Sequence, residues 1–197
     1  MTPVLSLMSG DVAPILESVD DPEESRWIAR AKTGDDAAYL WLLSRYRLRA
    51  VRLAAHVLRR DSEAEDVAQE AFIRAFRDIR TLRAERFLPW LYRIVVRLCL
   101  DRKRLTRWTS EQPMSAAPEL VTAHGVSESV TERVVVEMLL DRLSPPMRAV
   151  LVLRELECLD YEEIAGVLGI PIGTVRSRLN SARSQFRILW KENIGDE

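Results

Sequence analysis

The chain has 197 residues, of which 47% are hydrophobic and 30% charged, and its formal net charge at pH 7 is −1. This composition is typical of a globular protein with one large domain or two small ones, and it excludes a disordered polar chain. Two isolated cysteines, Cys99 and Cys158, exclude a disulfide framework and a cysteine-based zinc site, and they indicate a reducing compartment.

Residues 1–22 are predicted to form an acidic, poorly ordered segment. Residues 1–25 carry six acidic side chains and no basic one, and prolines interrupt any regular pattern. Residues 1–10 lack the positive start of a signal peptide. No apolar run reaches the roughly 20 residues that a membrane span needs. We therefore expect a cytoplasmic protein.

Two amphipathic helices are predicted next. The first covers residues 24–32, where Trp27, Ile28 and Ala31 form the apolar side. The second covers residues 37–59 and includes His56, which we interpret as structural because a lone histidine on such a helix has no second ligand nearby. The expected buried positions of this second helix are Leu40, Leu43, Val51, Ala54, Ala55 and Leu58.

A third helix is predicted over residues 61–79, with a continuous apolar stripe. Its first ten positions carry five acidic residues and no basic one, which suits the positive end of the helix dipole. A second face, mostly polar with one apolar residue, would equally suit a partner helix. The residues alone leave both interpretations open. This second face consists of Asp66, Gln69, Glu70 and Ile73.

The segment from Ala71 to Trp108 is strongly basic. Eleven Arg or Lys residues stand against three acidic ones, a net charge of +8, which favours a polyanionic partner. Residues 81–87 are predicted to form an exposed loop. A helix is then predicted over residues 89–108, with Pro89 in its first turn.

Basic and aromatic residues alternate on this helix. Arg93 and Arg97 share one side, and Trp90 and Tyr92 lie close to them. Such a surface suits single-stranded nucleic acid, because arginines hold the backbone while rings stack on bases. The alternative is a solvated arginine face above aromatic residues that belong to the core.

Residues 109–129 are mostly small and polar, and we interpret them as a flexible linker. Helices are predicted over residues 130–142 and from Ser144-Pro145 onward. Together these features predict an all-α protein with two small helical domains: residues 23–108 and residues 130–197, joined by the linker.

The stretch from Asp160 to Phe186 reads as a helix-turn-helix. Asp160 and Glu163 have the spacing of a capping box, and Gly169 ends the first helix. On the second helix, Val175, Leu179, Ala182 and Phe186 recur at helical spacing and are predicted to be core.

The opposite face of that second helix is small and polar, with Arg176 on its shoulder and Arg178 and Arg183 on its flanks. Small polar groups between arginines suit a DNA major groove, where the centre reads base edges and the flanks meet phosphates. The alternative is an ordinary helical hairpin with a solvated face.

No catalytic pattern is present in the sequence: it has no Gly-rich phosphate loop, no HExxH and no CxxC. We therefore expect a protein that is not an enzyme, with no catalytic residues, no metal and no cofactor.

Three stretches together resemble the extracytoplasmic-function (ECF) family of bacterial sigma factors. They are AEDVAQEAFIRAFR (Ala64–Arg77), FLPWLYRI (Phe87–Ile94) and LSPPMRAVLVLRELECLDYEEIAGVLGIPIGTVRSRLNSAR (Leu143–Arg183). The resemblance implies that residues 23–108 are sigma region 2 and residues 130–197 sigma region 4. It also implies transcription initiation by RNA polymerase core enzyme, in a stress or envelope response.

The resemblance also implies site residues. Core polymerase would dock on Asp66, Gln69, Glu70 and Ile73. The melted nontemplate strand of the downstream promoter element would meet Leu82, Arg83, Arg86, Phe87, Trp90, Tyr92, Arg93 and Arg97. The duplex of the upstream element would meet Thr174, Arg176, Ser177, Arg178, Asn180 and Arg183.

The chain departs from the family pattern at two places. The loop at residues 82–87 is shorter than in most members, and Leu88-Pro89 stands where a basic residue and a threonine are commoner.

The expected partners are core polymerase, promoter DNA and an anti-sigma factor, with no membrane insertion. The rival interpretations are a helix-turn-helix regulator that acts on duplex DNA without being a polymerase subunit, and a polymerase-binding decoy.

Overall fold

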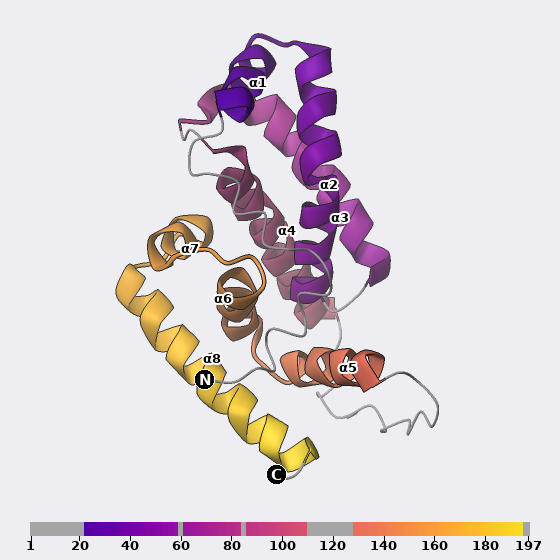
Figure 1. Ribbon diagram of the computed structural model, residues 1–197, viewed down its shortest axis with the longest axis vertical. Helices are drawn as coiled ribbons and strands as arrows, with labels where there is room; N and C mark the ends of the chain where they lie inside the picture. The colour runs from indigo at the N-terminus through magenta and orange to yellow at the C-terminus, as the bar shows by residue number, and fades with distance from the viewer. Residues whose placement is uncertain (1–21, 59–60, 84–85, 110–127, 195–197) are drawn as a thin grey trace.

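A computed structural model describes residues 22–58, 61–83, 86–109 and 128–194, and every regular element in these ranges is helical. The prediction of an all-α fold is confirmed. The helices form two groups, α1 to α4 and α5 to α8, which lie against each other (Figure 1). The predicted amino-terminal segment and most of the predicted linker fall outside the described residues, and the domain boundaries stay a prediction.

The first group is built on three long helices with a short one across their end. It comprises α1 (Pro22–Lys32), α2 (Asp36–Leu58), α3 (Asp61–Asp78), the 3₁₀ turn η2 (Ile79–Thr81) and α4 (Phe87–Thr109). Helices α2, α3 and α4 pack pairwise around the apolar stripe of α3, where Ala68, Ala71 and Ala75 are buried. Small side chains at those positions allow the neighbouring helices to approach closely.

The predicted buried face of α2 is partly wrong. Leu40 is 66% exposed, whereas Ala38, Leu42 and Tyr46 are buried. The buried series continues with Ala50, Leu53, Ala54, Val57 and Leu58. Because α2 is apolar on more than one side, the spacing of its apolar residues is compatible with two different buried faces. Packing against α1, α3 and α4 selects the face that places the small alanines inside.

The second group comprises α5 (Glu128–Asp141), α6 (Pro145–Glu155), α7 (Tyr161–Leu168) and α8 (Ile172–Ile194). The capping box is formed as predicted: Glu163 N donates to Asp160 Oδ1 (2.7 Å) and Asp160 N donates to Glu163 Oε2 (2.9 Å). Gly169 ends α7 with φ +65°, a left-handed conformation that glycine adopts without strain. The four predicted core positions of the second helix, Val175, Leu179, Ala182 and Phe186, are all buried.

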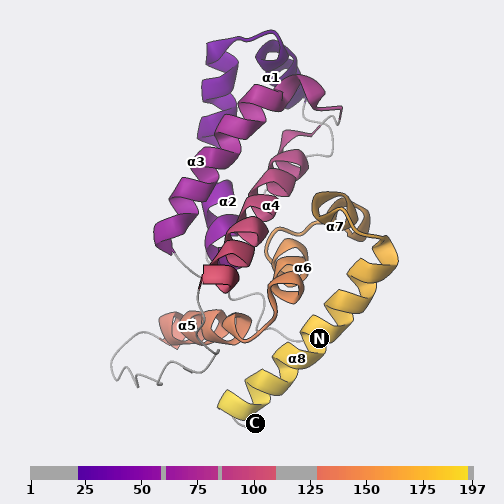
Figure 2. The same cartoon turned by 180° about the vertical axis from the view of Figure 1, so that it is seen from behind.

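The two groups share an interface. Helix α7 packs on α4 and helix α6 on α2, and the view from behind shows the same arrangement (Figure 2). Across it, the guanidinium of Arg148 on α6 donates to the carbonyl oxygen of Val57 in the last turn of α2 (3.5 Å). The second group therefore contacts the first along α4 and at the end of α2.

Candidate functional site

The second face of α3 lies on the surface. Asp66 and Gln69 are exposed, and Ile73 exposes 61% of its area. Glu70 is half-buried, because its carboxylate pairs with Arg74 one turn along (2.6 Å) and with Arg102 of α4 (3.6 Å). The four residues form one ridge of acidic and amide groups with an apolar end.

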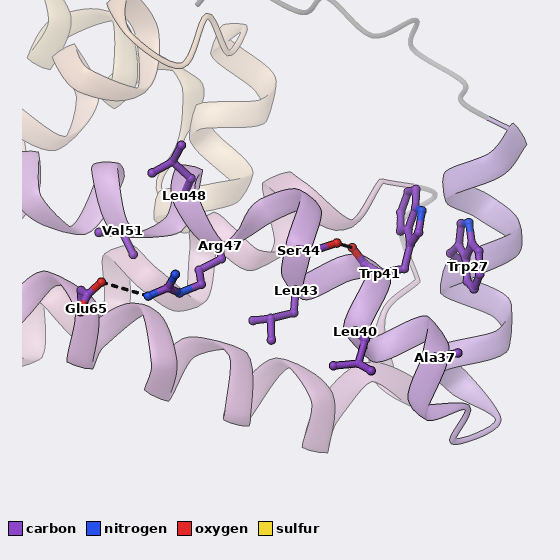
Figure 3. A pocket seen from close by; sticks show the side chains of 10 residues that line it. All are labelled: Trp27, Ala37, Leu40, Trp41, Leu43, Ser44, Arg47, Leu48, Val51 and Glu65. Atoms are coloured by element: carbon purple, nitrogen blue, oxygen red, sulfur yellow. Dashed lines mark hydrogen bonds and ion pairs between the residues drawn. The ribbon is translucent and has the colours of Figure 1, made fainter.

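A groove of about 720 Å³ lies along α2, with Trp27 of α1 at one end and Glu65 of α3 at the other (Figure 3). The rings of Trp27 and Trp41 stack at one end, with their centroids 5.4 Å apart. At the other end, Arg47 of α2 pairs with Glu65 of α3 (3.0 Å), next to the ridge. Leu40 and Leu48, exposed by 66% and 58%, add apolar surface along it. The groove is therefore mostly apolar, and none of the four ridge residues lines it.

The segment before α4 is more buried than the sequence indicated. Helix α4 begins at Phe87, and Leu82 and Phe87 are 2% and 0% exposed, so the prediction of an exposed loop is wrong at these two positions. The physical reason is an aromatic cluster: the ring of Phe87 lies 5.6 Å from that of Tyr46 and 5.8 Å from that of Trp90, centroid to centroid. Leu82 and Phe87 anchor the ends of the loop.

The remaining predicted strand-binding residues divide into two sets. Arg83, Arg93 and Arg97 are exposed on or just before α4, and Trp90 is half-buried. Arg86 and Tyr92, by contrast, contact the second group of helices. Arg86 Nη1 pairs with Glu163 Oε1 of α7 (2.5 Å), and the buried Tyr92 hydroxyl donates to the carboxylate of Glu157.

Burial governs the protonation of this last pair. It raises the pKa of Tyr92 well above its ordinary value, and the nearby negative charge of Glu157 raises it further. It also raises the pKa of Glu157, against the opposing effects of the Tyr92 hydrogen bond and of Arg49 and Arg52 on α2. The tyrosine hydroxyl therefore stays protonated and acts as the donor to a carboxylate that has lost much of its water.

The predicted reading face of α8 is accessible. Arg176, Ser177 and Asn180 are exposed near its amino-terminal end, and Thr174 and Arg178 are half-buried beside them. Arg183 is held in place: its Nε and Nη2 both donate to Glu155 Oε1 of α6 (3.0 and 2.6 Å), and this hydrogen bonding raises its pKa. The helix therefore presents small polar groups and an arginine at the end that enters a groove in helix-turn-helix proteins.

The described residues contain no candidate metal site and no candidate membrane span. None of their His, Cys, Asp and Glu side chains gather into a group that could hold a metal ion. None of the helices is both long enough and apolar enough to cross a membrane.

Three residues that organise these surfaces could not be found by sequence reasoning: Arg148, Glu155 and Glu157. In the sequence, Glu155 and Glu157 belong to an acidic stretch before the helix-turn-helix, and Arg148 is one arginine among many. Their partners lie on other helices, so no local spacing reveals the pairs.

The capping box supports a first prediction, on stability. Asp160→Ala is expected to lower the free energy of unfolding by about 1 kcal/mol, because it leaves an amide at the start of α7 without its acceptor. Urea denaturation followed by circular dichroism measures the change. Glu162→Ala, at an exposed position in the same first turn, is the control and is expected to stay within about 0.5 kcal/mol of the unmodified protein. Equal losses of unfolding free energy in the two variants would mean that the capping box does not contribute to stability.

Comparisons with known proteins identify both groups of helices. Residues 42–109 match the family profile described as Sigma-70 region 2, and residues 133–186 match the profile described as Sigma-70, region 4. The first match covers most of α2 to α4, and the second covers α6 and α7 with parts of α5 and α8.

Full-length relatives agree with the profiles. The chain is 36% identical to the ECF RNA polymerase sigma factor SigE of Mycolicibacterium smegmatis, over 79% of this chain and 63% of that protein. It is 31% identical to SigW of Bacillus subtilis, over 81% and 92% of the two chains. It is 32% identical to the sigma-E factor of Escherichia coli K12, over 79% and 88%.

Two solved structures share the fold. CnrH, solved in complex with the cytosolic domain of CnrY, superposes with a TM-score of 0.64 at 22% identity, over 86% of this chain and 98% of that one. The sigma factor RpoE of Bartonella quintana, solved with the anti-sigma factor NepR, gives 0.60 at 21% identity, over 79% and 98%. Profiles, relatives and fold agree: the chain belongs to the ECF family of RNA polymerase sigma factors.

Proposed function

We propose that this sigma factor brings RNA polymerase core enzyme to promoters through three surfaces: the ridge on α3, the basic face of α4 and the reading face of α8. One observation carries the proposal. A single chain exposes an acidic ridge ending in Ile73 on one group of helices and a polar, arginine-flanked helix on the other. A protein that only reads duplex DNA needs the second surface and has no use for the first.

The proposed docking site for core polymerase is the ridge on α3, formed by Asp66, Gln69, Glu70 and Ile73. Asp66 and Gln69 offer polar groups to a partner helix. Ile73 offers an apolar side chain that is exposed to water in the free chain and would be buried against the partner. Glu70 is already shared between Arg74 and Arg102, so we assign it an orienting role in the ridge.

The basic face of α4 is the proposed binding surface for the melted strand. Arg83, Arg93 and Arg97 are placed to hold phosphates, and Trp90 offers the accessible ring. Leu82 and Phe87 act through the loop: anchored in the core, they set the position of Arg83 and of the first turn of α4. An unpaired base trapped here would offset part of the cost of strand opening, a few kcal/mol per base.

The chain performs no covalent chemistry in this proposal and requires no cofactor, because opening is driven by differential binding. It acts in the cytoplasm, where polymerase and DNA are. CnrH was solved with the cytosolic domain of CnrY, and the sigma factor RpoE of Bartonella quintana with the anti-sigma factor NepR. An anti-sigma factor is the corresponding proposed partner of this chain.

The deciding experiment is run-off transcription with purified core polymerase on a set of candidate promoters from the source genome. A start-site-specific transcript that requires the added chain is the expected result. If the chain instead binds a duplex operator tightly and never directs a transcript from any promoter that it binds, the rival interpretation of a regulator outside the polymerase holds.

Base reading by α8 supports a second prediction. Arg176→Ala is expected to weaken binding to the upstream element by roughly 1–3 kcal/mol, because an arginine fork to a guanine edge is lost. Gel-shift titration of cognate and scrambled duplexes measures it. Arg187→Ala, also exposed but about three turns further along α8, is the matched control and is expected to reduce both affinities slightly and equally. Equal loss on scrambled DNA from Arg176→Ala would contradict base reading.

A further inference from the structure

The guanidinium of Arg183, on α8, is bound by groups of the same chain. Its Nε and Nη2 both donate to Oε1 of Glu155, the last residue of α6, at 3.0 and 2.6 Å. The hydrogen bond with Glu155 raises the pKa of Arg183, and a hydrogen bond with Tyr161, the first residue of α7, raises it as well. One side chain of the reading helix therefore contacts both of the helices that precede it.

The partners of Arg183 are themselves fixed in place. Arg154, next to Glu155, donates from Nη1 to Leu159 O (2.7 Å) in the turn between α6 and α7. Its guanidinium carbon lies 5.3 Å from the centroid of the Tyr161 ring, a cation–π distance. Glu155 exposes only 21% of its side chain. The groups that receive Arg183 thus have a defined geometry at the junction of α6 and α7.

This junction lies two turns beyond the reading residues. Helix α8 packs on both α6 and α7 (Figure 1). Arg176 stands seven positions before Arg183, about 10 Å along the axis and on nearly the same side of α8. The buried Val175 and Leu179 hold this part of the helix through apolar contacts, which have no direction. The ion pair is directional, because two N–H groups of one rigid guanidinium meet one oxygen, and so it can fix the angle at which Arg176 is presented.

We propose that Arg183 is a positioning residue of the reading helix rather than a phosphate ligand, and that it acts on base reading through Glu155. Its donors are directed at α6, so a phosphate would have to displace the carboxylate to bind them. Because the upstream element is the proposed partner of α8, this role rests on that proposed function. It replaces the contact with DNA that the family resemblance implies for Arg183.

The exposure of the ion pair agrees with positioning rather than stabilisation. Arg183 exposes 42% of its side chain, and ion pairs that water reaches contribute little to the free energy of unfolding. Loss of the pair is therefore expected to leave the helices folded and to let α8 adopt several angles. A recognition helix at the wrong angle loses contacts with base edges but keeps its attraction to phosphates. Specific binding then falls, whereas nonspecific binding does not.

The variant Glu155→Ala decides between the two roles, because they predict opposite changes. If Arg183 positions α8, the preference for cognate over scrambled duplex is expected to fall about tenfold, which corresponds to roughly one good base contact. If Arg183 binds a phosphate, Glu155 competes with DNA for the guanidinium, and its removal tightens binding to both duplexes. Glu162→Ala removes the same charge from an exposed position of α7 and is the matched control, expected to tighten both affinities slightly and equally. Gel-shift titration measures all four affinities.

Two further variants complete the test. Arg183→Ala, alone and combined with Glu155→Ala, is expected to give the same loss of preference as Glu155→Ala, because each substitution removes the same contact. Glu155→Gln keeps an oxygen acceptor and is expected to retain most of the preference. The slope of log affinity against log salt concentration is expected to be unchanged by Arg183→Ala, whereas loss of a phosphate contact would reduce it by about 1. Circular dichroism checks that every variant keeps its helices.

Three results would overturn the positioning role: an unchanged or tighter cognate complex with Glu155→Ala, additive losses in the double variant, or a reduced salt slope with Arg183→Ala. Arg176→Ala separates this failure from failure of the proposed function. If Arg176→Ala also leaves the preference for cognate duplex unchanged, α8 does not read bases. If it lowers that preference while Glu155→Ala does not, base reading stands and only the role of Arg183 is refuted.

Discussion

Arg148→Met is expected to lower the free energy of unfolding by about 3 kcal/mol, because it removes the donors from several buried carbonyl oxygens at once. The guanidinium is 1% exposed. Its Nε donates to Leu140 O (2.8 Å), and its Nη2 donates to Asp141 O (3.0 Å) and Leu143 O (3.1 Å). These are carbonyls at the carboxyl end of α5 and just beyond it, of which Leu140 O also accepts from Leu143 N (3.1 Å).

The methionine keeps the length and apolar volume of the arginine stem, so the measured loss reports the hydrogen bonds rather than a cavity. Urea denaturation with helix content as the signal gives the midpoint and the slope. Arg142→Met is the control, because Arg142 is exposed and its ion pair with Glu192 is long (3.8 Å); a change within about 0.5 kcal/mol is expected. A midpoint for Arg148→Met equal to that of the control would mean that water replaces the guanidinium at those carbonyls.

Arg148 also reaches Val57 O on α2, so the same substitution is expected to loosen the contact between the helix groups. Small-angle X-ray scattering would detect this as an increase in radius of gyration. Stability and the contact between the helix groups are thus linked through one buried side chain of α6.

The helix-turn-helix was predictable from sequence because its determinants are local. Asp160 and Glu163 form their capping box within one turn, Gly169 ends the helix by its own backbone conformation, and the core positions of α8 follow a single period. No contact with a distant part of the chain is needed to place these elements. The acidic ridge of α3 was predictable for the same reason, since its residues share one face of one helix.

Other features depend on what packs against them. Helix α2 is apolar on several sides, so only its neighbours decide that Leu42 is inside and Leu40 outside. Phe87 looked like an exposed loop residue because nothing in its local sequence shows that Tyr46 and Phe72 surround it. The interface between the helix groups is the extreme case: Tyr92 and Glu157 are 65 residues apart, and neither shows an unusual local pattern.

Ile73→Asp is expected to weaken the affinity for core polymerase by at least about 2 kcal/mol, or roughly thirtyfold, because it places a charge in the apolar contact of the docking ridge. The substitution leaves the fold intact, since Ile73 is 61% exposed and contributes little to the core. Affinity is measured by fluorescence anisotropy with labelled chain and purified core enzyme. Run-off transcription is expected to fall in parallel and to recover at high concentration of the variant, because promoter reading by α8 is unchanged.

Ile188→Asp on α8 is the matched control, with 55% of the same side chain exposed. If both substitutions weaken binding equally, exposed apolar surface in general, rather than the ridge, attracts the polymerase. If Ile73→Asp binds core as well as the unmodified chain, the ridge is not the docking site, and the acidic start of α3 serves only the helix dipole.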